Sequence, residues 1–261
     1  MKKFLLCILP LLLMIFLSGC TDSTPVSSEL TEATAESTSA EATTTAAATT
    51  SESETTAQQT TAVTTTEKPS LTEDWKLLLI NSRNPVPKDY TLNLKEISEG
   101  ISVDKRIVKN LKKLLEDAHA EGYKLVIVSA YRTKKEQKKI YNGKKDEFIK
   151  RGYSEKEAVK LTEGWVAKPG RSEHQTGLAV DINPESGKSA EAYKWLAKNC
   201  IKYGFIVRYP TEKSDITGIN HEPWHFRYVG KEHAKKMKSK NLTLEEYIKQ
   251  IRKSEKANNG K

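Results

Sequence analysis

Cysteine is scarce in this sequence, with three residues among 261. Cys7 and Cys20 lie close to the N-terminus, so Cys200 is left alone in the remainder of the chain. A fold held together by disulfides within that remainder is therefore excluded. Cys200 falls in a helical pattern of apolar residues, which predicts a buried core thiol rather than a catalytic one.

Aromatic residues and apolar periodicity are both missing from residues 21–70, which consist almost entirely of Thr, Ser, Ala, Glu and Gln. Such a segment cannot bury enough apolar surface to offset the entropy lost on ordering. Residues 21–70 are therefore predicted to be a disordered stalk, which as a flexible coil would span about 40 Å root-mean-square.

Long apolar runs are also scarce. Phe4 to Leu17 is one such run; it follows two lysines and is short for a membrane span. The Leu-Ser-Gly-Cys sequence that ends at Cys20 resembles the bacterial lipobox, so residues 1–20 are predicted to be a lipoprotein signal peptide and Cys20 the lipidated residue. The protein is then expected to lie outside the cytoplasm, lipid-anchored to the bacterial cell membrane. An ordinary signal peptide or an uncleaved anchor is the alternative.

Acidic residues are concentrated ahead of Asp74, whereas the remainder of the chain is basic; the whole sequence carries a net charge of +9. A basic exported domain suits anionic surroundings such as cell-wall polymer, although solvated lysines on helix faces explain the charge equally well. Residues 71–261 have the length of one domain. No nucleic-acid-binding module is recognisable, and the export signal argues against one.

Hydrophobic periods mix helices and strands without a repeated βαβ unit, which predicts an α+β domain with a central antiparallel sheet flanked by helices. Strands are expected at 75–81, 123–132, 178–182, 205–209 and 224–229. Helices are expected at 102–122, from the capping residues Thr133 and Ser154, at 189–204, and as a C-terminal pair whose second member is capped by Thr243 and Glu246.

The sequence His-Glu-Pro-Trp-His at 221–225 matches the H-E-x-x-H helix motif of zinc proteases, with Glu245 as a possible third ligand. That motif requires a helical turn, and Pro223 would remove a backbone donor and clash inside it. The following residues, Phe-Arg-Tyr-Val, favour a strand. The helical interpretation is therefore rejected. Two further histidines, His119 and His233, fall in lysine-rich helices and are expected at the surface.

A different set of residues accounts better for the chemistry. His174, Asp181 and His225 supply two nitrogens and one carboxylate oxygen, which is the ligand pattern of a catalytic zinc site with an open fourth position. A bound dication would also explain why Asp181 lies in an apolar strand. Glu222 is then free to act as general base. The ordinary alternatives are a loop histidine and an Asp181 paired with a lysine.

Taken together, several blocks of the sequence resemble the VanY-type zinc D,D-carboxypeptidases, a family that includes related L,D-carboxypeptidases and shares its α+β fold with the hedgehog signalling domain. The resemblance covers roughly residues 75–250. The matching blocks are SAYRT (129–133), SEHQTGLAVDI (172–182), KYGFIVRYP (202–210), EPWHFRYVG (222–230) and LTLEEYI (242–248).

The resemblance implies that His174, Asp181 and His225 bind Zn²⁺ and that Glu222 is the base. It implies that Arg132 polarises the scissile carbonyl and holds the oxyanion, while Ser172 and Gln137 grip the end of the peptide. His221 falls where the family pattern fixes nothing.

The position of Arg132 at the end of an apolar strand suits that role independently, because a fixed guanidinium can stabilise a developing oxyanion; a salt bridge to a nearby acid is the alternative. Tyr131 and Trp224 are expected either to line the pocket or to pack in the core.

These observations predict a zinc metallocarboxypeptidase that acts as a monomer. It is expected to remove the C-terminal D-alanine from peptidoglycan stem peptides. Three alternatives stay open. They are an L,D-carboxypeptidase acting on tetrapeptide stems, an endopeptidase, and a hedgehog-like domain that binds peptidoglycan without cutting it. The intact Glu222 argues against the last, since a pure binder needs no base.

Overall fold

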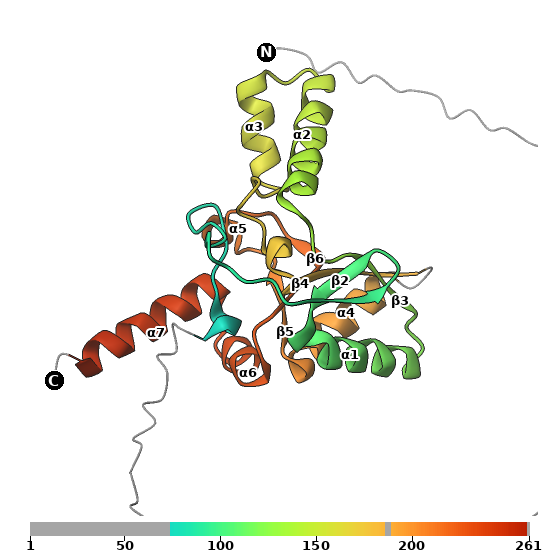
Figure 1. The fold of residues 1–261 in the computed structure, drawn as a ribbon, viewed down its shortest axis with the longest axis vertical. Coiled ribbons are helices and arrows are strands. Elements are labelled where there is room, and N and C mark those ends of the chain that lie inside the picture. The colour runs from blue at the N-terminus through green and yellow to red at the C-terminus, as the bar shows by residue number, and fades with distance from the viewer. Residues whose placement is uncertain (1–73, 186–188, 260–261) are drawn as a thin grey trace, which may run out of the picture. The chain divides into compact units, whose positions relative to one another are not determined.

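The computed structural model describes residues 74–185 and 189–259 (Figure 1). The predicted signal peptide with Cys20 and the predicted stalk lie outside these residues. Among the helices that the structure does describe, none is both long and apolar enough to cross a membrane.

A four-stranded antiparallel sheet organises the domain, in the order β3-β4-β6-β5. Its strands are β3 (Leu125–Ser129), β4 (Ala179–Pro184), β5 (Phe205–Tyr209) and β6 (Glu222–Tyr228). The central strands β4 and β6 are largely buried. The predicted α+β class and antiparallel sheet are confirmed.

The strand β3 is more exposed than its apolar sequence suggests. It lies at an edge of the sheet, and its side chains alternate in exposure, with Val126 37% and Val128 51% exposed. An apolar run alone does not distinguish a strand covered on two faces from an edge strand covered on one.

Two predictions for the beginning of the domain are wrong. The expected strand at 75–81 contains a 3-10 helix, Trp75–Leu77, which begins where the Asp74 carboxylate accepts a hydrogen bond from the Lys76 backbone. The expected helix from Ser102 begins later. Residues Ile101–Asp104 form strand β2, which pairs with β1 (Leu94–Ser98).

The helix α1 (Val108–Ala120) follows β2 through a 3-10 turn. Asp104 rather than Ser102 starts that turn, because its carboxylate accepts a hydrogen bond from the Arg106 backbone N–H. Sequence offers several polar residues that can cap a helix, and the pairing of β2 with β1 decides between them.

The main core lies between the sheet and two helical segments, α1 and α4 (Ser189–Asn199) with its 3-10 continuation Cys200–Tyr203. Its fully buried members include Leu111, Leu114, Val180, Ile182, Leu196 and Phe226. Cys200 is 1% exposed, and burial raises the pKa of its thiol to about 12, which agrees with a core role.

A second core forms where α6 (Lys231–Ser239) and α7 (Leu244–Asn259) pack around Leu77. His233 belongs to this region, so the prediction that it lies at the surface is wrong. It is 7% exposed and lies between the Tyr247 hydroxyl, 2.9 Å from Nδ1, and the Asp74 carboxylate, 3.3 Å from Nε2. His119 is exposed, as predicted.

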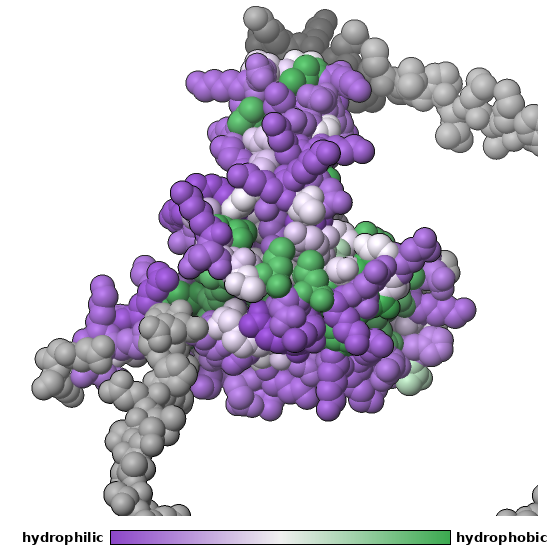
Figure 2. All heavy atoms as spheres, in the orientation of Figure 1, coloured by the Kyte–Doolittle hydropathy of each residue, from purple (hydrophilic) through white to green (hydrophobic). Residues whose placement is uncertain are grey.

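The helices α2 (Lys134–Lys150) and α3 (Glu155–Glu163) form a hairpin that projects from the sheet (Figure 1). The predicted capping boxes at Thr133 and Ser154 are both present, and Thr243 forms the corresponding pair of hydrogen bonds with Glu246 before α7. Hydrophilic residues cover most of this hairpin (Figure 2). The short helix α5 (Ser214–Thr217) lies between β5 and β6.

Gly177 joins the turn that carries His174 to strand β4, and its backbone cannot easily accept a side chain. Its φ is +72°, and a Cβ atom would lie 2.8 Å from the Asp104 nitrogen. Gly177→Ala is therefore expected to lower the free energy of unfolding by about 1–2 kcal/mol for the left-handed backbone and about 1–3 kcal/mol more for the clash.

Gly152→Ala is the matched control for urea unfolding of the two variants. Gly152 has a φ of +91°, but a Cβ atom there would meet nothing within 4 Å. Gly152→Ala should therefore lower the free energy of unfolding only by the contribution of the left-handed backbone. An equal decrease in both variants would contradict the predicted clash at Gly177.

Candidate metal centre

Strand pairing and one turn bring the three predicted ligands together. Asp181 on β4 is the direct cross-strand partner of His225 on β6. His174 lies in the 3-10 helix Glu173–Thr176 immediately before β4. The potential ligand atoms of the three residues lie within 4.8 Å of one another, and all three residues are buried.

The distances between these atoms suit a small tetrahedral cation. His174 Nε2 lies 3.4 Å from Asp181 Oδ2, and His225 Nδ1 lies 3.3 Å from Asp181 Oδ1. Ligand atoms about 2.0–2.1 Å from a zinc ion at tetrahedral angles are about 3.3 Å apart. His174 Nδ1 lies 2.7 Å from the Ala130 carbonyl oxygen, to which it can donate, leaving Nε2 free to accept a metal.

Unpaired buried atoms provide a second test of the fit. His174 Nε2 and Asp181 Oδ1 are buried and have no hydrogen-bond partner among the described residues. Buried polar atoms are normally satisfied, because leaving them unpaired costs free energy. A cation between these atoms would satisfy them, and two nitrogens with one carboxylate oxygen match the donor set of catalytic zinc.

Charge in the site is balanced around Asp181. Burial opposes its ionisation, but His174 and His225 together hold its pKa well below the usual range. Burial likewise opposes a charge on His225, yet Asp181 and Glu173 outweigh that effect and raise its pKa to about 9.

Arg132 also contacts Asp181. Its Nη2 donates to Asp181 Oδ2 at 3.0 Å, its Nη1 to Gln137 Oε1 at 3.0 Å and its Nε to Ser129 Oγ at 2.9 Å. The salt-bridge alternative for Arg132 is thus realised in this structure. The same contacts fix the guanidinium at the wall of the metal cavity.

Glu222 begins strand β6 and is 7% exposed, with Oε2 lying 3.5 Å from His225 Nδ1. Burial raises the pKa of this carboxyl to about 7. A carboxyl that titrates near neutrality beside a metal site can both accept and return a proton, as a general base must.

The H-E-x-x-H helix is excluded by the structure, since 222–228 are a strand. His221 is exposed, and its Nδ1 lies 2.9 Å from the Tyr209 carbonyl oxygen instead of facing the other histidines. Glu245, the third ligand of that alternative, lies in α7 and pairs with Arg208.

A cavity of about 180 Å³ opens onto these groups. Ser172 and Gln137 line it, and so does Trp224, for which core packing was the alternative. Tyr131 is not among its lining residues. Its backbone N–H donates to the Ser102 carbonyl, which places it beside strand β2.

Sequence reasoning missed a buried charge cluster behind His225. Glu173 Oε1 accepts hydrogen bonds from Arg208 Nε at 2.8 Å and Arg227 Nη1 at 2.7 Å, and all three side chains are fully buried. Glu173 Oε2 lies 3.6 Å from His225 Nε2. The available signal was an arginine within each of two apolar strand sequences, FIVRY and WHFRY, which requires a buried acidic partner.

The cluster orients the second ligand. With His225 Nδ1 turned to Asp181, the opposite nitrogen faces Glu173, an arrangement in which a carboxylate fixes the ring and its tautomer. The two arginines outweigh burial and keep Glu173 ionised by lowering its pKa. Glu245 Oε1 and Oε2 in turn accept hydrogen bonds from Arg208.

Together, the fold and the three-ligand site with its adjacent carboxyl define a metallopeptidase. Residues 100–231 match the family model described as VanY, D-alanyl-D-alanine carboxypeptidase. A D-alanyl-D-alanine carboxypeptidase of Enterococcus faecalis (strain ATCC 700802 / V583) is 44% identical over 178 residues, which cover 67% of this chain and 66% of that protein. The chain thus spans about two thirds of that relative's length.

Solved structures agree with this match. A mutant of the D,D-pentapeptidase VanY from a VanB-type resistance cassette, in complex with Zn(II), is 44% identical, with a TM-score of 0.66 over 67% of this chain and 99% of that chain. VanYB in complex with D-alanine-D-alanine is equally similar and is covered to 98%. The L,D-carboxypeptidase LdcB is 35% identical, with a TM-score of 0.55 over 66% of this chain and 84% of that chain.

This chain belongs to the VanY family of D-alanyl-D-alanine carboxypeptidases. The predictions of family, fold class and carboxypeptidase class are confirmed. The predicted zinc cofactor agrees with the donor set of the site and with the zinc in the related structure.

Removing a ligand should remove the metal. His174→Ala and His225→Ala are each expected to weaken zinc binding by more than about 100-fold, because loss of a ligand exceeds the 10- to 100-fold loss typical of an outer-shell partner. His221→Ala is the matched control and should keep its zinc. Metal content after dialysis and competition with a chromogenic chelator measure this. If His221→Ala loses its zinc while His174→Ala and His225→Ala retain theirs, the assignment of the metal ligands is wrong.

Glu173→Gln should weaken zinc binding by about 10- to 100-fold, because the amide no longer holds the His225 ring as a carboxylate does. The same charge change at exposed Glu185 serves as the control and should leave zinc affinity unchanged. Thermal unfolding of the metal-free proteins separates a loss of folding from a loss of affinity. Unchanged affinity in a folded Glu173→Gln protein would refute the orienting role.

Proposed function

We propose that this chain is a zinc-dependent D,D-carboxypeptidase that removes the C-terminal D-alanine from peptidoglycan stem peptides. The observation that carries the proposal is the group of His174, Asp181 and His225 with Glu222 beside it, in a member of the VanY family. The related structures that hold Zn(II) and D-alanine-D-alanine support the cofactor and the substrate.

His174 Nε2, Asp181 and His225 Nδ1 would hold the metal. Bound zinc supplies a Lewis acid and lowers the pKa of a water molecule to about 7. Glu222 takes a proton from the attacking water and passes it to the amine of the departing D-alanine. The peptide bond breaks, and the new carboxyl group remains on the shortened stem.

Arg132 is the candidate for stabilising the oxyanion. A fixed guanidinium beside the reacting carbonyl contributes about 3–4 kcal/mol by analogy with single oxyanion donors. In this structure Arg132 also holds Gln137, whose amide in turn donates to the Ala167 carbonyl at 2.7 Å. Gln137 and Ser172 both line the cavity, where they can bind the terminal carboxylate of the peptide.

Carboxypeptidase action requires strict recognition of the peptide end. A site built to bind a terminal carboxylate leaves its donors unpaired when that group is absent, and discrimination can then reach about 10⁴. An L,D-carboxypeptidase remains the second candidate, because LdcB shares the fold at 35% identity. The higher identity of the two VanY structures, 44%, favours D,D specificity.

Glu222→Gln is expected to bind zinc normally but to turn over at least about 100-fold more slowly, because a positioned base contributes about 10²–10⁴-fold. Mass spectrometry should show that a pentapeptide ending in D-Ala-D-Ala loses one D-alanine. The same peptide with a C-terminal amide should resist cleavage.

Faster cleavage of a tetrapeptide ending in L-Lys-D-Ala than of the pentapeptide would assign L,D specificity instead. Hydrolysis of internal bonds alone would refute the carboxypeptidase proposal.

We further propose that the domain is a monomer tethered outside the cytoplasm through a lipid on Cys20, with residues 21–70 as a spacer. The sequence pattern before Cys20 supports the anchor, and a diacyl lipid provides the two chains that stable attachment takes.

Cys20→Ser should therefore leave the protein unprocessed or release it from the membrane fraction. Mass spectrometry of the mature N-terminus measures this directly. A wild-type protein that begins at another residue and carries no lipid would refute the anchor.

A further inference from the structure

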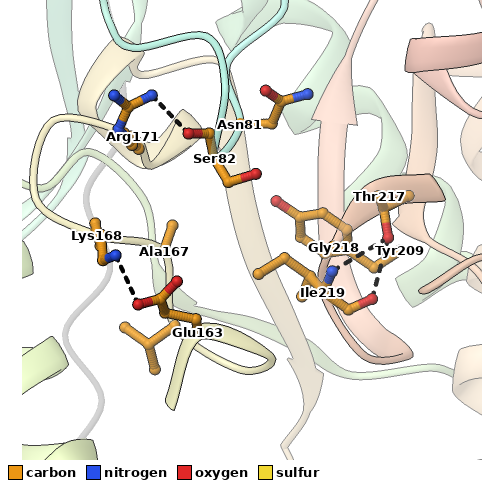
Figure 3. Close-up of a pocket in the computed structure, with 11 residues that line it drawn as sticks. Asn81, Ser82, Glu163, Ala167, Lys168, Arg171, Tyr209, Thr217, Gly218 and Ile219 are labelled. Carbon is orange, nitrogen blue, oxygen red and sulfur yellow. Dashed lines mark hydrogen bonds and ion pairs between the residues drawn. The ribbon is translucent and has the colours of Figure 1, made fainter. Parts of the chain in front are cut away.

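A second cavity of about 280 Å³ adjoins the metal cavity (Figure 3). The two share four lining residues: Val166, Ala167, Tyr209 and Ile219. Arg132 and Gln137 line the metal cavity and not this one, whereas Lys168 and Arg171 line this cavity and not the other. A peptide bound at the metal can therefore extend past this shared wall into the second cavity.

Two cations give the second cavity its chemistry. Lys168 and Arg171 both come from the segment between α3 and His174, and both side chains lie at the wall of the cavity in Figure 3. Arg171 Nη1 donates to the Ser82 carbonyl at 2.7 Å, which uses one of its five N–H groups.

Lys168 pairs with the Glu163 carboxylate at 2.6 Å, with side chains 50% and 38% exposed. Exposed pairs of this kind contribute little to stability, so the ammonium can turn to another anion at small cost. Opposite Lys168 and Arg171, the wall is formed by Tyr209 and Ile219 (Figure 3). Glu163 also lines the cavity, so one side carries two cations and one carboxylate, and the other side is partly apolar.

We infer that the second cavity binds the part of the stem peptide that precedes the two terminal D-alanines, with Lys168 and Arg171 holding the free α-carboxylate of its γ-linked D-glutamate. The inference rests on the proposed function, which supplies a stem peptide as substrate. A γ-linked glutamate is a negatively charged residue within such a peptide, and a lysine beside an arginine fork is suited to a carboxylate. Amidation of that carboxylate removes the charge that the two cations recognise.

The experiment compares kcat/KM for three peptides with the zinc-loaded protein: L-Ala-γ-D-Glu-L-Lys-D-Ala-D-Ala, the same peptide with D-isoglutamine, and acetyl-L-Lys-D-Ala-D-Ala. Wild type should prefer the acid over the amide about tenfold, the effect of roughly one charge-assisted hydrogen bond. Lys168→Gln and Arg171→Gln should each reduce this preference, and the double variant should abolish it. None should change cleavage of the acetylated tripeptide by more than about twofold.

Lys160→Gln is the matched control, because Lys160 is exposed on α3, carries the same charge and does not line the cavity. It should retain the wild-type preference, which excludes an effect of net charge alone. Thermal unfolding checks Arg171→Gln for loss of the contact with Ser82. The inference would be overturned if wild type cleaved the acid and the amide with equal kcat/KM. It would also be overturned if the variants lost kcat/KM equally on all three peptides.

Binding separates this inference from the proposed function. Zinc-loaded Glu222→Gln protein should bind the acid peptide about tenfold more tightly than the amide in calorimetry, without turnover. If wild type cleaves none of the peptides but the binding preference is present and lost in Lys168→Gln, the reaction is wrong and the subsite stands. Equal affinity for both peptides overturns the subsite, whatever the reaction.

Discussion

The ionised carboxylate of Asp181, on a central strand of the sheet and 8% exposed, is the constraint on which the site depends. A buried charge without partners is far too costly to keep, so the surrounding residues have to compensate it. Here His174, His225 and Arg132 all approach its two oxygens. The same geometry that compensates the charge also places ligand atoms at the spacing that zinc requires.

A second buried carboxylate, Glu173, is compensated in a different way. Two arginines that are 0% exposed bind one of its oxygens, and the other faces His225. Glu245 from α7 binds Arg208, and Asn81 donates to Glu245 at 3.1 Å. The C-terminal helix therefore supports the metal site through Arg208 and Glu173. A network of this kind is rigid because each member would be left unpaired by the movement of another.

The residues proposed to bind the peptide come from other parts of the fold. Gln137 lies in the first turns of α2, and Lys168 and Arg171 lie in the segment that returns from α3 toward His174. The hairpin of α2 and α3 and the segment after it are thus placed to shape substrate recognition, while the sheet and the turn before β4 carry the metal ligands. Separating the two functions lets the exposed hairpin vary without disturbing the buried charges around the metal.

Sequence alone determined the residues whose chemistry is local or follows a specific pattern. The histidines and the aspartate could be assigned because their donor types match zinc, and Pro223 was enough to reject a helix around His221 and His225. The capping boxes at Thr133 and Ser154 were predictable because their hydrogen bonds join residues three apart.

Tertiary structure decided what depends on residues distant in the chain. The pairing of β1 with β2 placed Ser102 in a strand, the edge position of β3 exposed Val128, and packing against Asp74 and Tyr247 buried His233. Partners for Arg208 and Arg227 could not be chosen from the sequence, because Glu173 lies 35 residues from Arg208 and 54 from Arg227. The sequence determines which charges the chain contains, and only the folded sheet decides which of them share a buried volume where they must neutralise one another.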